Sequence, residues 1–225
     1  MKTNLRILVV DNHYLFLQGV MTSLNTLGFK DVVISESCDE AYRLIINAKN
    51  KNPFDVMITD LGFGANHQRN LLDSGESLIK TIRKAGIKLK ILVLSAHSET
   101  NRVFNVIENL NPDGYLLKDH CETQEIGFAI QKIMRNERHY SHQIHQKILR
   151  RNILGIRLDE VALQILKELP KHPKISNLEG IIKKSNGGDL KLRSIETKLS
   201  NLRIDLDANN NADLVLKAKE LGLID

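Results

Sequence analysis

Five short apolar runs follow one another through the first half of the chain, and they limit the possible folds more than any other feature. They are LRILVV (5–10), VVIS (32–35), VMIT (56–59), KILVLS (90–95) and GYLL (114–117). Each run is rich in Val, Ile and Leu and nearly continuous, which is typical of strands buried on both faces of a parallel sheet. The pattern therefore predicts an α/β domain with five parallel strands.

Helical spacing of apolar residues fills the segments around these runs. We expect helices over 14–27, 39–50, 75–85, 99–109 and 122–135. Strands that alternate with helices are joined by right-handed crossovers, so the sheet is expected to be open and doubly wound. Ligands bind such sheets outside the carboxyl ends of the strands, and functional residues are expected there.

Four of the five predicted strands end on polar residues. Asp11 and Asn12 follow the first strand, and Asp60 follows the third. Ser95 closes the fourth strand, and Lys118 follows the fifth. Because parallel strands end at one rim, these carboxylates, the hydroxyl and the ammonium are expected to lie close together.

The motifs LVVDNH, MITDL, LVLSAHS and GYLLKD, which contain these residues, resemble the receiver domain of bacterial response regulators over about residues 4–135. The resemblance implies a flavodoxin-like fold and a phosphoryl group accepted on Asp60 from a sensor histidine kinase. A divalent cation, Mg²⁺, would neutralise the charge of the incoming group. The implied metal ligands are Asp11, Asn12, Asp60 and the main-chain carbonyl of Gly62.

The same resemblance gives roles to three further residues. Lys118 would pair with a phosphoryl oxygen, and Ser95 would hydrogen-bond another. Tyr115 stands where the family often has an aromatic residue that changes rotamer together with that hydroxyl. Ser95 and Tyr115 are thus the implied switch residues, and His13 is expected at the rim of the pocket.

Two departures from the family pattern lie beside this site. The family usually has two adjacent acids after the first strand, and here the second is Asn12, whose amide brings no negative charge. Binding of Mg²⁺ is therefore expected to be weakened. The glycine that normally follows the acceptor by about eight residues matches Gly75, fifteen residues on, which indicates an insertion of about seven residues.

Beyond residue 135 the strand pattern stops. We expect a basic, partly helical linker over 136–156, followed by an all-α module over 157–225. Its predicted helices are 158–169, 175–185, 190–206 and 211–222, and the receiver would occupy 1–135.

The end of this module, SIETKLSNLRIDLDANNNADLVLKAKELGLI (194–224), resembles the LuxR-type helix-turn-helix of the NarL/FixJ class. A recognition helix over 191–206 would bury its apolar positions and present polar side chains to DNA. Residues 171–204 carry eight Lys and Arg against three Asp and Glu, which suits a polyanion. The candidate DNA-binding residues are Lys191, Arg193, Ser194, Glu196, Thr197, Lys198, Asn201 and Arg203.

Together these features predict a phosphorylation-controlled transcription regulator that binds double-stranded DNA as a homodimer and is not an enzyme. No apolar run approaches the roughly 18 residues that span a bilayer, so a cytoplasmic location is expected, with no membrane partner. Cys38 and Cys121 form no CxxC pair and predict neither a zinc site nor a disulfide framework.

Two alternatives stay open. The first is a phosphorylation-independent pseudo-receiver that acts as a protein-interaction adaptor, favoured by Asn12, by the insertion and by Glu196. The second is a hydrolase of the haloacid dehalogenase type with Asp60 as the nucleophile. That chemistry needs a second acid two residues later, where this chain has Gly62.

Overall fold

A computed structural model describes residues 4–63, 71–184 and 187–224. The chain forms two compact units, one of residues up to 98 and 105–144, the other of residues 99–104 and from 145 on, so that one division falls within helix α6 (His142–Arg157). The first unit is built around a sheet and the second around short helices. Each unit is described by itself below.

The first unit is a parallel sheet with strand order β2-β1-β3-β4-β5-β6. The order places β1 between β2 and β3, as expected where a doubly wound sheet changes direction. The prediction of a doubly wound α/β sheet is confirmed, but the predicted number of five strands is one too low. The strands are β1 (Arg6–Val10), β2 (Asp31–Ser35), β3 (Val56–Thr59), β4 (Lys90–Ser95), β5 (Gly114–Leu117) and β6 (His139–Tyr140).

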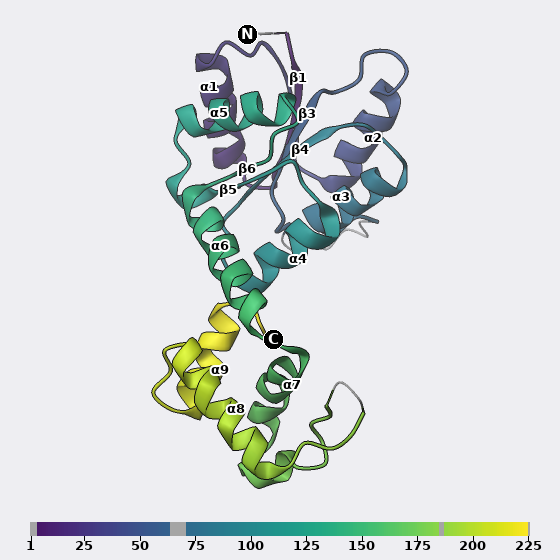
Figure 1. The fold of residues 1–225 in the computed structure, drawn as a ribbon. Coiled ribbons are helices and arrows are strands. Elements are labelled where there is room, and N and C mark those ends of the chain that lie inside the picture. The colour runs from purple at the N-terminus through teal and green to yellow at the C-terminus, as the bar shows by residue number, and fades with distance from the viewer. Residues whose placement is uncertain (1–3, 64–70, 185–186, 225) are drawn as a thin grey trace. The chain divides into compact units, whose positions relative to one another are not determined.

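Helices cover both faces of this sheet, as Figure 1 shows. Contacts join α1 to α5 on one side, and α2 to α3 on the other. The core beneath α1 and α5 consists mostly of aliphatic side chains from the strands and the helices, together with Phe29. The helices between these strands are α1 (Tyr14–Thr26), α2 (Cys38–Ala48), α3 (Gly75–Lys84), α4 (Thr100–Leu110) and α5 (Thr123–Met134), with the short 3-10 helix η1 (Lys118–His120) after β5.

Strand β6 lies within the range 136–156 that the sequence predicts as a linker. It pairs with β5 in parallel, with Gly114 opposite His139 and Tyr115 opposite Tyr140. A Cβ on Gly114 would lie 2.9 Å from the carbonyl oxygen of His139, so a side chain there would push β6 away. Two polar residues give no strand periodicity, which explains why the pattern of apolar runs missed this strand.

Gly75 lies against the end of β3. Its amide donates to the carbonyl of Leu61 at 3.1 Å, so Gly75 is held directly beside the end of this strand. A Cβ on Gly75 would lie 1.8 Å from the carbonyl oxygen of Asp60, which no real contact tolerates. This position therefore requires glycine, for a steric reason that concerns the proposed acceptor itself.

We predict that Gly75→Ala destabilises the chain by about 1–3 kcal/mol or more, because the backbone after β3 must shift. The matched control is Gly19→Ala in α1, where an added Cβ meets nothing within 4 Å. That change is expected to be neutral or stabilising by up to about 1 kcal/mol. Chemical denaturation of both variants tests this, and equal stabilities would contradict the packing argument.

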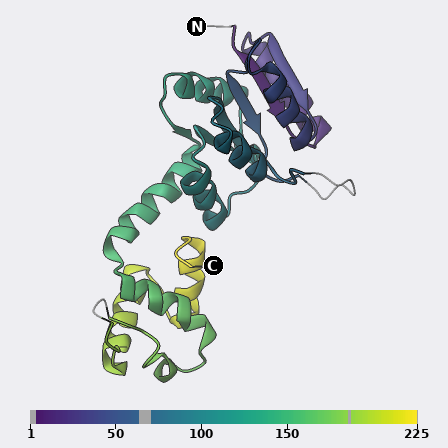
Figure 2. The ribbon, with the colours of Figure 1, turned by 90° about the vertical axis from the view of Figure 1, so that its right-hand side faces the viewer.

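The second unit encloses its own aliphatic core with α7 (Glu160–Glu168), η2 (Leu169–Lys171), η3 (Ile175–Leu178), α8 (Leu192–Asp205) and α9 (Asn211–Glu220). Figure 2 shows these helices from a second direction. Ile195, Leu199 and Leu202 are buried on the inner face of α8, as the spacing predicts. Leu206, just beyond the helix, is also buried, whereas Leu192 is only half-buried.

The prediction of a helix over 175–185 is wrong. Over 175–184, the part of this range that the structure describes, only the 3-10 helix η3 forms, and Gly180 follows it with φ of +83°. A left-handed residue of this kind ends a helix. The chain then turns back through Gly187, also left-handed, and forms an antiparallel bridge between Lys183 and Asp189.

Candidate phosphoryl-acceptor site

The register of the sheet brings the polar strand ends together. Val10 pairs with Thr59, so the residues that follow them, Asp11 and Asp60, lie side by side. Ser95 pairs with Leu117, the residue before Lys118. The main chain alone therefore explains why residues so distant in sequence meet at one rim.

Lys118 links the two carboxylates. Its Nζ lies 2.6 Å from Oδ2 of Asp11 and 2.9 Å from Oδ2 of Asp60. All three side chains are largely buried, so the ion pairs are only weakly screened by water. The same Nζ lies 4.2 Å from the ring centroid of Phe16, a cation–π contact that the sequence analysis missed.

Asp60 is held in its ionised form. Burial alone would raise the pKa of its carboxyl group, but the hydrogen bond and the charge of Lys118 outweigh this effect. Hydrogen bonds from Ser95 and from the amide of Leu61, 2.7 Å from Oδ1, act in the same direction. The pKa of Asp60 is therefore below its ordinary value, and the group is a carboxylate at neutral pH.

The two predicted switch residues meet at His97. The Oγ of the fully buried Ser95 accepts from the amide of His97 at 3.3 Å. The hydroxyl of Tyr115, also fully buried, donates to the carbonyl of His97 at 2.7 Å. His97 stands inside the motif LVLSAHS, but sequence reasoning gave it no role because its part is played by main-chain atoms.

The residues around Asp60 fit a divalent cation. One ligand atom each from Asp11, His13 and Asp60 lie within 4.8 Å of one another. Oδ1 of Asn12 is buried and has no hydrogen-bond partner among the described residues, so an oxygen is available that a cation could use. Gly62 is half-buried directly beyond the acceptor, with its space bounded by the His97 ring.

The segment before α3 is anchored to the start of α2. Both carboxylate oxygens of Asp39, in the first turn of α2, accept main-chain amides of Leu71 and Leu72 at 3.0 and 3.1 Å. Most of the remaining insertion predicted from the sequence lies outside the described residues.

The cysteines take no part in the chemistry of the site. Burial is the main reason that the pKa of each of the Cys38 and Cys121 thiols is raised to about 12. The thiolate is the reactive form of cysteine, so both groups are inert at neutral pH.

We predict that iodoacetamide at pH 8 alkylates the native chain roughly three orders of magnitude more slowly than the chain in denaturant. Unfolding should return the thiol pKa from about 12 towards about 8.5. Mass spectrometry of Cys38 and Cys121 peptides measures both rates. Rapid alkylation of either thiol in the native chain would contradict the raised pKa values.

The candidate DNA-binding residues lie on α8 or directly before it. Lys191, at the N-cap, and Arg193, Ser194, Glu196, Thr197 and Asn201 are exposed, whereas Lys198 and Arg203 are half-buried. The ammonium of Lys198 forms an ion pair with Asp159, whose carboxylate also caps α7. The hydrogen bond from Lys198 is the main reason that the pKa of Asp159 is lowered.

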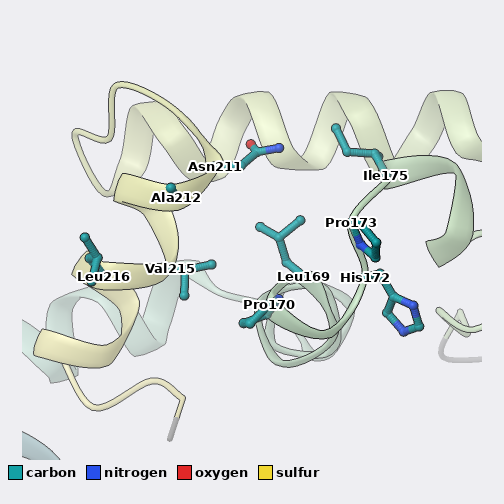
Figure 3. Close-up of a pocket in the computed structure, with 9 residues that line it drawn as sticks. All are labelled: Leu169, Pro170, His172, Pro173, Ile175, Asn211, Ala212, Val215 and Leu216. Atoms are coloured by element: carbon teal, nitrogen blue, oxygen red, sulfur yellow. The ribbon is translucent and has the colours of Figure 1, made fainter.

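A groove of about 430 Å³ lies between η2, η3 and α9 within the second unit (Figure 3). Its nine lining residues are mostly aliphatic and include no acidic, hydroxyl or thiol group. His172 belongs to the lining, and its Nε2 lies 3.5 Å from a carboxylate oxygen of Glu168, a residue that does not line the groove. This lining offers no pair of groups suited to phosphoryl transfer, so the rim of the sheet remains the candidate site.

A comparison with protein families identifies residues 7–131 as a response regulator receiver domain. The chain belongs to the response regulator receiver family. Among curated proteins, the response regulator is 26% identical over 167 residues to the nitrate/nitrite response regulator protein NarP of Escherichia coli K12, covering 74% of this chain and 72% of that protein. It is 29% identical over 151 residues to a Haemophilus influenzae homologue, covering 67% of each.

Solved structures extend the likeness of this response regulator to the second unit. A structure of RcsB from Salmonella typhimurium matches with a TM-score of 0.60 and 20% identity, covering 95% of this chain and 97% of the other. RcsB bound to promoter P1flhDC in the presence of the phosphomimetic BeF3⁻ matches with a TM-score of 0.54 and 19% identity, covering 97% and 99%. The predicted receiver is confirmed at the level of family, and the predicted two-part architecture, a receiver followed by a helical module, at the level of fold.

Among the described residues, no helix combines the length and the apolar character that crossing a bilayer requires.

Proposed function

We propose that this protein is a phosphorylation-controlled, DNA-binding transcription regulator whose phosphoryl acceptor is Asp60. The observation that carries the proposal is the arrangement of Asp11, Asp60 and Lys118 within hydrogen-bonding distance at the carboxyl ends of β1, β3 and β5. A sensor histidine kinase is the phosphodonor that suits a receiver domain. A cytoplasmic location and a domain division of 1–135, 136–156 and 157–225 are parts of the same proposal.

In the phosphoryl transfer, a carboxylate oxygen of Asp60 attacks the phosphorus of a phosphohistidine. The new O–P bond forms as the P–N bond breaks, and the electron pair returns to the imidazole of the donor. Asp60 is suited to this role because it is ionised at neutral pH. Lys118, now paired with both carboxylates, would turn to a phosphoryl oxygen and neutralise its charge.

Mg²⁺, when bound, supplies the charge neutralisation that lets a carboxylate and a phosphoryl group approach each other. Asp11 and Asp60 would provide anionic oxygens, and Asn12 and the carbonyl of Gly62 neutral ones. The buried, unpartnered Oδ1 of Asn12 supports its inclusion. The chain acts as the acceptor of the group, so its role is that of a regulator and not of an enzyme.

The proposed switch works through His97. A phosphoryl group on Asp60 would draw the hydroxyl of Ser95 towards one of its oxygens and away from the amide of His97. Tyr115 holds the carbonyl of the same residue, so the two side chains are coupled through one peptide segment. Phosphorylation would then shift the receiver between two states that exist beforehand.

The helical unit would bind duplex DNA through α8. Helix-turn-helix proteins place the N-terminal residues of the recognition helix on base edges in the major groove. Arg193, Ser194, Glu196, Thr197 and Asn201 are exposed there and suit this role. Lys191 and Arg203 would contact phosphates, whereas Lys198 must first leave its ion pair with Asp159.

We expect the protein to bind DNA as a homodimer, because a single module makes few base contacts. Equilibrium titration of the full chain against pooled genomic duplexes, at low and at physiological salt, tests the proposed output. The expected result is selective binding that weakens steeply with salt, as condensed counterions are released. If the full chain binds no duplex at low salt, the proposal that it is a transcription regulator is excluded.

A protein-interaction adaptor that is not controlled by phosphorylation remains the second candidate function. It is favoured because the pocket has Asn12, a neutral amide, where the family usually has a second anionic metal ligand. An adaptor would bind a protein partner without acyl-phosphate formation. Absence of both phosphorylation and DNA binding in the full chain would favour it.

A further inference from the structure

We propose that His13 is a nitrogen ligand of the divalent-cation site, so that the site prefers a first-row transition ion of the Co²⁺ and Zn²⁺ class over Mg²⁺. The inference uses the same pocket as the proposed function, and so rests on it for the location of the cation. Metal binding is nevertheless measured without any phosphodonor, so each idea can fail alone.

The position of the imidazole is the first observation. His13 is the N-cap residue of α1, yet its side chain makes no capping hydrogen bond. Its Nδ1 instead lies 3.0 Å from Oδ1 of Asp11. One ligand atom from each of His13, Asp11 and Asp60 falls within a group 4.8 Å across. The imidazole is therefore turned to the acidic pocket and not to the end of its own helix.

The spacing suits two ligands of one ion. Ligand atoms about 2.1 Å from an octahedral cation and at right angles to each other lie about 3.0 Å apart. The distance between Nδ1 of His13 and Oδ1 of Asp11 has this value. Both atoms could therefore bind one cation at their present separation, once the imidazole turns so that its Nδ1 lone pair faces the ion and not Asp11.

Asp11 is oriented for this arrangement. Its Oδ1 accepts the main-chain amide of His13 at 2.8 Å, while Oδ2 accepts from Lys118 at 2.6 Å. The oxygen nearer to His13 is thus distinct from the oxygen that pairs with the lysine. A cation on the His13 side would not need to displace Lys118 from Asp11.

Proton balance is also satisfied. In the absence of a cation, the contact between Nδ1 and Asp11 requires a proton on Nδ1. A cation needs the lone pair of Nδ1, so that proton must be lost to solvent and the neutral ring must carry its proton on Nε2. The side chain of His13 is 66% exposed, so water can exchange these protons and solvate Nε2–H.

The charge and type of the ligands decide which ion benefits. Two carboxylates against the ammonium of Lys118 leave one net negative charge, because Asn12 stands where the family has an acid. Mg²⁺ prefers anionic oxygen ligands and gives up its waters reluctantly. The loss of a carboxylate therefore weakens the binding of Mg²⁺ more than that of ions that accept nitrogen ligands. An imidazole suits Zn²⁺, Co²⁺ and related ions. His13 thus offsets the missing charge only for ions that accept nitrogen.

The test is titration of the full chain with Co²⁺, followed by its visible absorption, with Zn²⁺ and Mg²⁺ as competitors. Wild type is expected to bind Co²⁺ at least about tenfold more tightly than Mg²⁺. His13→Ala should lower the affinity for Co²⁺ about 10-fold or more and shift the visible absorption of the bound Co²⁺. It should change the affinity for Mg²⁺ less than about twofold. His142→Ala, an exposed histidine on α6, is the matched control and should leave all affinities unchanged.

Two further variants keep the test decisive. His13→Gln preserves a polar side chain if the alanine variant folds poorly, and it should lose the same spectroscopic signature. Asn12→Asp should tighten Mg²⁺ binding and narrow the preference for Co²⁺. Wild-type Co²⁺ affinity and absorption in folded His13→Ala or His13→Gln would overturn the proposal. If Co²⁺ binds through His13 but Asp60 is not phosphorylated when a phosphodonor is added in a separate experiment, only the proposed function is rejected.

Discussion

Asp60→Asn is expected to abolish acyl-phosphate formation, because the amide has no anionic oxygen to attack phosphorus. In the native chain the carboxylate is buried, ionised and paired with Lys118 at 2.9 Å. Removal of a nucleophile eliminates covalent catalysis outright, so the expected loss is more than about 100-fold. Intact-mass analysis after incubation with a small phosphodonor and Mg²⁺ measures it.

Asp73→Asn is the matched control for this variant. Asp73 is exposed and lies just before α3, so the change removes one charge near the site without touching the acceptor. It should label as fast as wild type. If Asp60→Asn also labels as fast as wild type, the acceptor is another residue. If wild type never labels, the adaptor becomes the better account of the first unit.

Arg193→Ala is expected to weaken binding to preferred DNA about tenfold or more, and to relax the choice of sequence. Arg193 is exposed in the first turn of α8, where a recognition helix contacts base edges. A bidentate arginine–base contact contributes roughly 1–3 kcal/mol of discrimination. Equilibrium titration with selected and scrambled duplexes measures both affinity and selectivity.

Lys219→Ala, which removes an exposed positive charge from the last turn of α9, is the control. It should change affinity slightly and equally for both duplexes. Lys198→Ala should also have a small effect, because its ammonium is already paired with Asp159. Equal losses in the arginine variant and this control would indicate that α8 does not read bases.

Much of the fold could be predicted because buried parallel strands leave a direct trace in the sequence. The apolar run VMIT coincides with β3, and KILVLS coincides with β4. Strand β6 has only two half-buried polar residues, and it exists because Gly114 lets the next chain segment approach. Pairing of this kind is a tertiary effect that local periodicity cannot detect.

The helical unit shows the same limit. Apolar spacing over 175–185 matches a helix, but Gly180 takes a left-handed conformation and the chain turns back to form a bridge. The sequence also predicted Lys198 as a candidate contact to DNA. It could not show the ion pair with Asp159, because the two residues meet only when α7 and α8 pack together.

For the candidate site, the sequence located the polar strand ends and the register of the sheet explains why they meet. Phe16 beneath Lys118 left no signal, because an aromatic residue beside the inner face of a helix is ordinary core composition. The part played by His97 is carried by its main-chain amide and carbonyl, which no side-chain pattern reveals. The structure thus adds the coupling between Ser95 and Tyr115 to a residue set that the motifs had already suggested.

The central claim is that phosphorylation of Asp60 controls DNA binding, and one measurement tests it most directly. The affinity of the full chain for a selected duplex is compared with and without a phosphodonor and Mg²⁺, with phosphate occupancy followed by mass. Coupling between two sites typically changes affinity by about 5- to 150-fold. We expect a change in this range for wild type and none for Asp60→Asn, whereas equal affinities for phosphorylated and unmodified wild type would contradict the account.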